Sequence, residues 1–136
     1  MRPPGVAGAE WALACDTYAA SVVTPSKILI GLPAYGYDWD LTASTPPHYV
    51  GRTVPWTGFA ALIAQGGAVT HWDAKAESPY VDYTSSDGHV HEAWYEDPRS
   101  LQAKTAAVVS LGLGGISMWA LGDEDASFWR GAGRGL

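Results

Sequence analysis

The stretch KILIGLPAY, residues 27–35, decides the fold of this 136-residue chain. It is almost entirely apolar and rich in strand-forming residues, and it does not alternate between apolar and polar positions. An unbroken apolar run of this kind is typical of a strand that is covered on both faces, as in a parallel sheet. A second such run, GISMWAL at residues 115–121, lies near the other end of the chain. We therefore expect an α/β fold in which both runs are strands.

Residues 10–23, which precede the first strand, are predicted to form a helix. Four apolar or aromatic side chains recur at spacings of four, three and four residues, which places them on one helical face. They are Trp11, Cys15, Tyr18 and Val22. Thr24 and Pro25 then stop the helix.

A second helix is expected just before the last strand. Asp97 suits the N-cap position and Pro98 suits the first helical position, so the helix begins there. Gly112 and the glycines that follow it end the helix. Because a helix separates two non-alternating strands, we expect a parallel βαβ unit.

The residues between the first strand and this helix are predicted to form a small α+β insertion. Residues 38–56 contain three prolines and are expected to be a loop. Thr57 is expected to cap a short helix over residues 57–65, and residues 68–72 are expected to be a strand. Residues 80–84 and 89–95 are predicted to form a hairpin around a Ser-Ser-Asp-Gly turn. The insertion follows the carboxyl end of the first strand, where barrel enzymes carry their active-site loops.

Composition excludes several classes of partner. The net charge is -6 and the basic residues are scattered, which argues against nucleic acid. No apolar stretch is long enough to span a membrane, and no signal peptide is visible at the N-terminus. Cys15 is the only cysteine, so no disulfide can form within the chain.

Two groups of motifs resemble the family 18 glycoside hydrolases. The first strand carries the G-x-P-x-Y-G pattern of the family's seventh barrel strand, in Gly31, Pro33, Tyr35 and Gly36. The later residues resemble the end of the family's insertion subdomain, the next helix and the eighth strand. They are Trp94, Tyr95, Asp97, Ser100, Lys104, Gly115 and Trp119.

Further motifs resemble the bacterial cell-wall and spore-cortex N-acetylglucosaminidase branch of this family. They are Tyr37-Asp38-Trp39, Ser78-Pro79-Tyr80, His91-Glu92 and Phe128-Trp129. Each motif is short, but their number, order and spacing make the resemblance specific. It extends from about residue 10 to residue 129.

The resemblance implies the C-terminal portion of a TIM (β/α)8 barrel with an α+β insertion subdomain. A complete barrel needs roughly 200 residues or more, so the chain would be part of one. Residues 10–39 would be a helix and the penultimate barrel strand, and residues 40–96 the insertion. Residues 97–129 would be the last helix and strand, and residues 130–136 a frayed tail. The remainder of the barrel is expected upstream.

The implied activity is hydrolysis of β-1,4 bonds next to N-acetylglucosamine, in chitin or in the glycan strands of peptidoglycan. The family uses a substrate-assisted retaining mechanism, in which the substrate's acetamido oxygen attacks the anomeric carbon and a Glu protonates the leaving oxygen. No cofactor or metal takes part. The D-x-x-D-x-D-x-E motif that carries this Glu does not occur in the sequence, and neither does the family's M-x-Y. No catalytic residue is therefore assigned.

Trp119 and Tyr35 are the candidate substrate-binding residues. In the family, the Trp that matches Trp119 forms the floor of the sugar pocket; a core position is the alternative. The Tyr35 phenol could hydrogen-bond a sugar or pack in the turn. The acidic residues 123–125 follow the last strand, and we interpret them as solvated surface charge rather than as catalytic groups. We expect an exposed hairpin, rather than a zinc site, at His71, His89 and His91.

Three interpretations of the function stay open. The chain could be part of an active glycosidase, a glycan-binding module that lacks the acid, or an inactive truncated fragment. The parent protein would be secreted, or associated with the cell wall or the spore. The sequence does not indicate the compartment.

Overall fold

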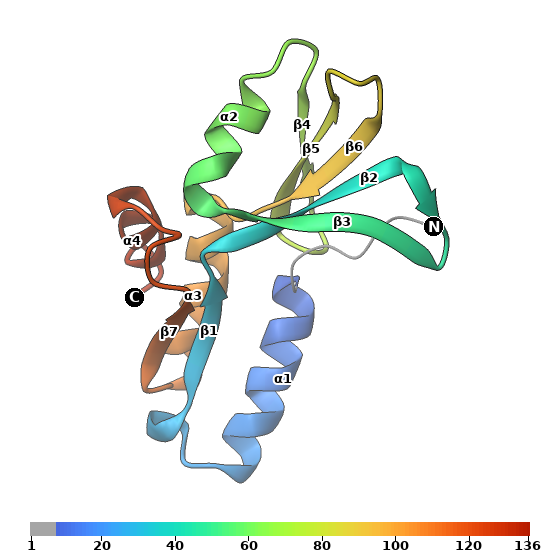
Figure 1. The fold of residues 1–136 in the computed structure, drawn as a ribbon. Coiled ribbons are helices and arrows are strands. Elements are labelled where there is room, and N and C mark those ends of the chain that lie inside the picture. The colour runs from blue at the N-terminus through green and yellow to red at the C-terminus, as the bar shows by residue number, and fades with distance from the viewer. Residues whose placement is uncertain (1–7) are drawn as a thin grey trace.

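The computed structural model describes residues 8–136, which form two neighbouring sheets flanked by helices (Figure 1). In chain order the helices and strands are α1 (Ala9–Val22), β1 (Leu29–Pro33), β2 (Tyr35–Thr45), β3 (His48–Pro55), α2 (Phe59–Ile63), β4 (Val69–Asp73), β5 (Ser78–Thr84), β6 (Val90–Trp94), α3 (Pro98–Leu111), β7 (Gly115–Trp119) and α4 (Ala126–Ala132). Short 3-10 turns occupy Pro25–Lys27 and Trp56–Gly58. The content is α/β, as expected.

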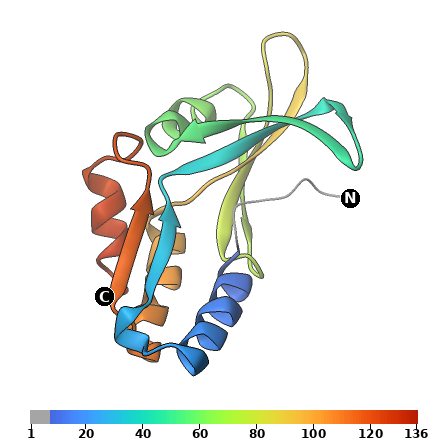
Figure 2. The ribbon, with the colours of Figure 1, turned by 60° about the horizontal axis from the view of Figure 1, so that its bottom comes forward.

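The parallel βαβ unit predicted from the two apolar runs is confirmed. β1 and β7 pair in parallel, from Leu29 opposite Gly115 to Pro33 opposite Trp119. Ile30 and Leu32 of β1 are buried in one core with Leu101 of α3 and Phe128 of α4. Figure 2 shows β1 and β7 side by side, with α3 and α4 next to them. The core of this unit therefore lies on one face of the strand pair.

The prediction that both faces of these strands are covered is wrong for the described part of the chain. Burial alternates along β1: Leu29 is 54% exposed, whereas Ile30 is 4% exposed. Trp119 is 74% exposed. The helices cover only one face, and within residues 8–136 neither outer edge of the pair bonds to another strand.

A five-stranded antiparallel sheet, in the order β3-β2-β6-β5-β4, forms the insertion. The expected loop over residues 38–56 is wrong, because most of it belongs to the hairpin of β2 and β3. The prolines do not prevent this pairing. Pro46 and Pro47 lie in the turn, and Pro55 ends β3, which is an edge strand where a missing N–H is tolerated.

The other insertion elements follow the predictions, with one exception. β4 and the hairpin of β5 and β6 are confirmed. The helix expected over residues 57–65 is shorter, since a 3-10 turn precedes α2, and Thr57 makes no capping bond. Asp97 caps α3 as predicted: its carboxylate accepts from the Ser100 N–H, and the Ser100 hydroxyl accepts from the Asp97 N–H.

The face of α1 predicted from spacing is exposed. Trp11, Tyr18 and Val22 are 64–70% exposed, and Cys15 is exposed as well. α1 instead packs against α3 through another side. None of the helices in residues 8–136 combines the length and apolarity that crossing a bilayer needs.

The frayed tail expected over residues 130–136 is also wrong. Asp125 caps α4, which continues through Ala132. Ala132 is 1% exposed, and its carbonyl accepts a hydrogen bond from the Thr105 hydroxyl at 2.9 Å. A Cβ on Gly135 would lie 2.2 Å from the Thr105 hydroxyl oxygen, so the last residues still pack closely on α3. Sequence composition missed these tertiary contacts.

Candidate functional site

A cavity of about 310 Å³ lies where the carboxyl ends of β1 and β7 meet the β2–β3 hairpin. It is lined by Tyr35, Tyr37, Thr53, Pro55, Trp119 and Asp123. The two candidate substrate-binding residues, Tyr35 and Trp119, therefore share one cavity. In barrel enzymes this end of the strands carries the active site.

Trp119 is held by the strand pair but does not belong to its core. It is the last residue of β7, opposite Pro33, and its carbonyl accepts from the Ala34 N–H at 2.7 Å. The Trp119–Ala120 peptide bond is cis. Because Trp119 is 74% exposed, the core alternative does not hold within the described residues.

Tyr35 begins β2 and is half-buried, opposite Pro55 of β3. Its ring contacts the Tyr37 ring edge-on at 5.7 Å. Burial, with a contribution from Tyr37, raises the pKa of the Tyr35 phenol. The phenol is therefore protonated at neutral pH and remains a hydrogen-bond donor.

Three of the cavity residues, Tyr37, Thr53 and Pro55, were missed as site residues because they were assigned to a loop or not singled out. The signal was present in the sequence, in the alternation Tyr35-Gly36-Tyr37-Asp38-Trp39. Side chains two residues apart on a strand point to one face, so the aromatic residues share a face and Gly36 and Asp38 point to the other.

The acidic residues 123–125 do not converge on one point. Asp123 lines the cavity. Asp125 caps α4 and also accepts from the Trp56 indole N–H at 3.1 Å. The hydrogen bond from the Ser127 side chain is the main cause that lowers the pKa of Asp125. The lowered pKa makes Asp125 a poor proton donor. Glu124 accepts from the Gly122 N–H at 2.8 Å. Asp125 and Glu124 thus have structural roles that do not require a catalytic function.

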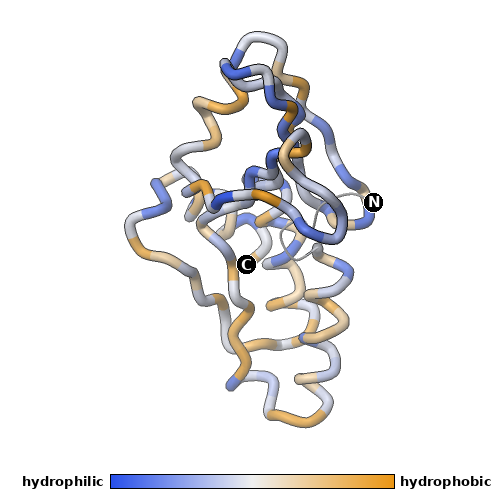
Figure 3. Tube along the Cα trace, turned by 45° about the vertical axis from the view of Figure 1, so that its right-hand side comes forward, coloured by the Kyte–Doolittle hydropathy of each residue, from blue (hydrophilic) through white to orange (hydrophobic). Residues whose placement is uncertain are grey.

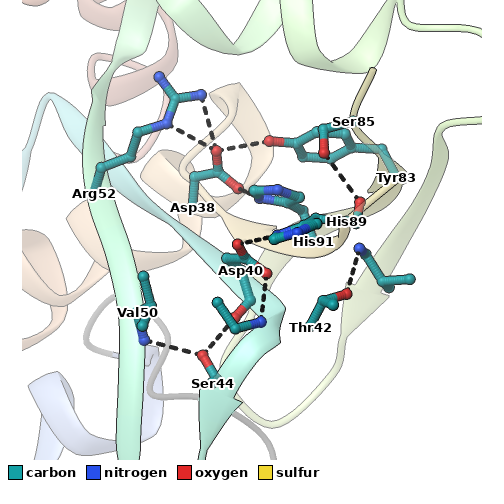
Figure 4. Close-up of polar contacts among 12 residues, drawn as sticks. Asp38, Asp40, Thr42, Ser44, Val50, Arg52, Tyr83, Ser85, His89 and His91 are labelled. Carbon is teal, nitrogen blue, oxygen red and sulfur yellow. Dashed lines mark hydrogen bonds and ion pairs between the residues drawn. The ribbon is translucent and has the colours of Figure 1, made fainter. Parts of the chain in front are cut away.

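The histidines of the hairpin are paired with carboxylates. His91 Nδ1 lies 2.9 Å from Asp38 Oδ1, and His89 Nδ1 lies 2.6 Å from Asp40 Oδ2 (Figure 4). The expected exposed hairpin holds at its turn, where the His89 side chain is 39% exposed, whereas the His91 side chain is only 15% exposed. The Asp40 partner raises the pKa of His89. Within residues 8–136 no group of three His, Cys, Asp or Glu side chains could hold a metal ion.

Asp38 is the buried anchor of the insertion sheet. Its carboxylate accepts from Arg52 at 2.9 Å and from the Tyr83 hydroxyl at 2.6 Å, besides contacting His91 (Figure 4). These partners come from β3, β5 and β6, so one carboxylate links four strands with its own β2. Burial, followed by the hydrogen bond to Asp38, raises the pKa of Tyr83, which keeps this phenol a donor.

Lys104, part of the family-like motif, forms a buried ion pair with Glu96. Its ammonium group also lies 3.4 Å from the Ser78 hydroxyl, so it links α3 to β5. Burial raises the pKa of Glu96, and its second carboxylate oxygen has no hydrogen-bond partner within residues 8–136. Neither residue lines the cavity, so this pair is structural.

Comparisons with known proteins agree with the geometry. The sequence description of glycosyl hydrolases family 18 matches residues 6–125. A cortical fragment-lytic enzyme of Bacillus subtilis is 38% identical over 82% of the chain and 26% of its own length. The crystal structure of a chitinase from Chromobacterium violaceum has a TM-score of 0.88 and 40% identity, over 98% of this chain and 40% of that one. The crystal structure of a spore cortex-lytic enzyme of Bacillus megaterium has a TM-score of 0.88 and 29% identity, over 100% of this chain and 32% of that one.

The chain spans less than half the length of each of these three proteins. The resemblance drawn from the sequence motifs, including the one to cortex-lytic enzymes, is confirmed. With 120 consecutive positions matched by one family description, from residue 6 to residue 125, the chain belongs to glycosyl hydrolases family 18.

Proposed function

We propose that the chain supplies the C-terminal portion of a TIM (β/α)8 barrel. β1 and β7 would be the penultimate and last strands. The insertion subdomain, expected from the sequence over residues 40–96, would begin earlier, with β2 at Tyr35, because β2 pairs within the five-stranded sheet and not with β1. The unpaired outer edges of β1 and β7 and the exposed second face support this assignment. In a closed barrel, upstream strands would bond to those edges and cover that face.

The proposed activity is hydrolysis of β-1,4-linked N-acetylglucosamine glycans, in chitin or peptidoglycan. The observation that supports it best is the shared cavity of Trp119 and Tyr35 at the carboxyl ends of the strands. The names of the relatives, a chitinase and cortex-lytic enzymes, point to the same class of substrate.

In the proposed mechanism this chain binds and positions the sugar. The Trp119 indole would form a flat apolar floor, which holds the reacting ring and keeps water from its acetamido oxygen. The Tyr35 phenol would donate a hydrogen bond to the sugar. The acetamido oxygen would attack the anomeric carbon while a Glu on an upstream strand protonates the leaving oxygen. Among the described residues that line the cavity, Asp123 is the only carboxylate, and it would not replace that Glu.

A second candidate is a glycan-binding module without catalysis. The lining of the cavity favours it, because Trp119, Tyr35 and Tyr37 form an aromatic surface, whereas residues 8–136 contribute a single carboxylate, Asp123, to the lining. Such a module would bind the same glycans and release no product.

A chimera tests the proposed activity. Residues 9–136 replace the matching portion of the Chromobacterium violaceum chitinase, whose upstream strands then complete the barrel. We expect the chimera to hydrolyse a chromogenic N-acetylglucosamine oligomer and the 136-residue chain alone to release nothing. The control is the chimera in which the host's catalytic Glu is changed to Gln.

A folded chimera that binds the oligomer without hydrolysing it would favour the binding module. A folded chimera that neither binds nor hydrolyses would contradict the proposed function. Turnover by the chain alone, if it disappeared in an Asp123→Asn variant, would show that the acid lies within this chain.

A further inference from the structure

We propose that Asp123 gives the cavity a preference for a glycan in which a glucosamine next to the reacting sugar lacks its acetyl group. The free amine of such a sugar is a cation, and the Asp123 carboxylate would bind it. This inference rests on the proposed function, because the class of glycan and the place of the reacting sugar come from there. It adds a specificity-determining residue and a charge preference, neither of which the sugar floor at Trp119 requires.

The Asp123 carboxylate lines the cavity, is half-buried, and has no hydrogen-bond or ion-pair partner among residues 8–136. The two acidic residues that follow it on the same turn are engaged elsewhere. Glu124 accepts a hydrogen bond from the Gly122 N–H at 2.8 Å, and Asp125 caps α4. The carboxylate that lines the cavity is therefore the one that is left to bind a ligand.

The backbone of Asp123 is held from two sides. Its N–H donates to the Ala120 carbonyl at 3.2 Å, and its carbonyl accepts from the Thr57 N–H at 3.3 Å. The turn after β7 is thus bonded to the short segment between β3 and α2. A side chain on a fixed backbone loses less conformational freedom when a ligand binds, so this position favours recognition by Asp123.

The rest of the cavity lining suits an ammonium group. No lysine or arginine of residues 8–136 lines the cavity, so no basic side chain in that part of the chain competes for Asp123 there. Three aromatic residues, Tyr35, Tyr37 and Trp119, line the same cavity, and aromatic rings attract cations to their faces. The net charge of -6 also attracts a cationic glycan at longer range.

A fully acetylated glycan satisfies this carboxylate less well than an amino sugar does. A sugar that covers Asp123 removes water from a charged group, which costs free energy unless a donor replaces that water. Hydroxyl and amide groups are neutral donors, whereas a protonated amine forms a charge-assisted hydrogen bond that is stronger. The reacting sugar must keep its acetyl group, because its acetamido oxygen is the nucleophile. The cation therefore belongs to a neighbouring sugar.

The test compares three disaccharides in titrations of the 15N-labelled 136-residue chain, followed through the Trp119 indole N–H signal. They are chitobiose, which is fully acetylated, and the two derivatives that lack the acetyl group on one sugar or on the other. At low salt we expect one derivative to bind about fivefold more tightly than chitobiose. The preference should shrink at about 1 M salt, which screens charges beyond about 3 Å. The Trp11 signal, on α1, should not move.

Asp123→Asn should bind the three disaccharides equally, because the amide keeps the shape of the carboxylate without its charge. Asp123→Glu keeps the charge and should retain most of the preference. Glu124→Gln is the matched control on the same turn, and it should keep the full preference, since its amide oxygen can still accept from the Gly122 N–H. The signal of the buried Trp94 indole reports whether each variant is folded.

The outcomes separate the two proposals. If chitobiose binds at least as tightly as both derivatives, or if Asp123→Asn keeps the preference, the role of Asp123 is overturned and the proposed function stands. A preference that is undiminished at about 1 M salt would overturn the charge pairing. If no disaccharide shifts the Trp119 signal, the proposed function and the role of Asp123 are both contradicted.

Discussion

The barrel portion, which is β1 and β7 with the helices that pack on them, and the insertion sheet differ in how completely they are built. β1 and β7 form only a two-stranded sheet, and large residues on its open face and edge are exposed, such as Leu29 and Trp119. The insertion has five strands and its own core, in which Val81 and Ala93 are 0% exposed. The barrel portion therefore needs more chain to complete it, whereas the insertion sheet is nearly self-sufficient.

The two regions are also stabilised differently. Apolar packing between strands and helices holds the barrel portion, and Phe128 is its largest fully buried side chain. The insertion adds a buried polar network around Asp38 to its apolar core. In Figure 3, hydrophilic segments (blue) are more frequent in the upper half of the trace than in the lower half, which is mostly pale or orange. Substitutions in one region should therefore leave the other largely intact.

Phe128→Ala should have the largest effect on stability, and it should act on the barrel portion. Removing a fully buried Phe costs about 3–5 kcal/mol, through lost transfer energy and a cavity. Hydrogen exchange of individual amides, measured in the variant, should accelerate in β1 and β7 and stay slow in β5 and β6. The neighbouring Trp129, which is 46% exposed, is the control, and Trp129→Ala should cost much less. Equal acceleration in both regions would show that they unfold together.

Asp38→Asn should loosen the insertion sheet and spare the barrel portion. The amide nitrogen cannot accept, so either the Tyr83 and Arg52 bonds or the His91 bond is lost, at about 1.5–3 kcal/mol for hydrogen bonds to a charged group. Urea unfolding gives the free energy, and amide exchange gives its location. Asp40→Asn is the matched control on the same strand and should cost less. A loss of protection confined to β1 and β7 would contradict this assignment.

Asp97→Ala should have a smaller effect, on the helix that joins the two regions. It removes the capping bond to the Ser100 N–H, which is worth about 1 kcal/mol. The melting temperature should fall, and exchange should accelerate in the first turn of α3. Lys75→Ala, at an exposed side chain, should stay within about 0.5 kcal/mol of the parent. An equal loss in both variants would mean that the cap does not stabilise α3.

The smallest effect concerns His89. Its pKa is raised mainly by the hydrogen bond to Asp40, so the contribution to stability is fully present below the unfolded value of about 6.5. It is lost as the pH rises through the folded pKa. An NMR titration of the His89 ring should give a midpoint above about 6.5, and Asp40→Asn should bring it down. An unchanged midpoint in Asp40→Asn would assign the shift to another group.

The sequence predicted elements whose signals are local. The cap at Asp97 and the hairpin of β5 and β6 follow from residue types at fixed spacings. The β2–β3 hairpin was missed because its prolines suggested a loop, although they lie in a turn and at a strand end. The frayed tail was wrong because contacts with Leu101 and Thr105 of α3, distant in sequence, order it.

The site was predicted in part. Tyr35 and Trp119 were chosen by their likeness to family motifs, and the structure places both at one cavity. Tyr37 and Thr53 were not chosen, because pairing across the hairpin brings them there. The exposure of β1 and α1 could not be predicted from their apolar patterns, which are the same whether or not further chain covers them.

The most direct test of the central claim is the effect of Trp119→Ala on kcat/KM in the chimera. If Trp119 is the sugar floor, kcat/KM should fall by about ten- to a hundredfold, or roughly 1.4 kcal/mol per factor of ten, because stacking and positioning are both lost. The melting temperature of the variant should change little by comparison. If Trp119 is instead a core residue in the completed barrel, the substitution should cost about 3–5 kcal/mol of stability. A normal kcat/KM in the folded fraction of a destabilised variant would contradict the sugar floor.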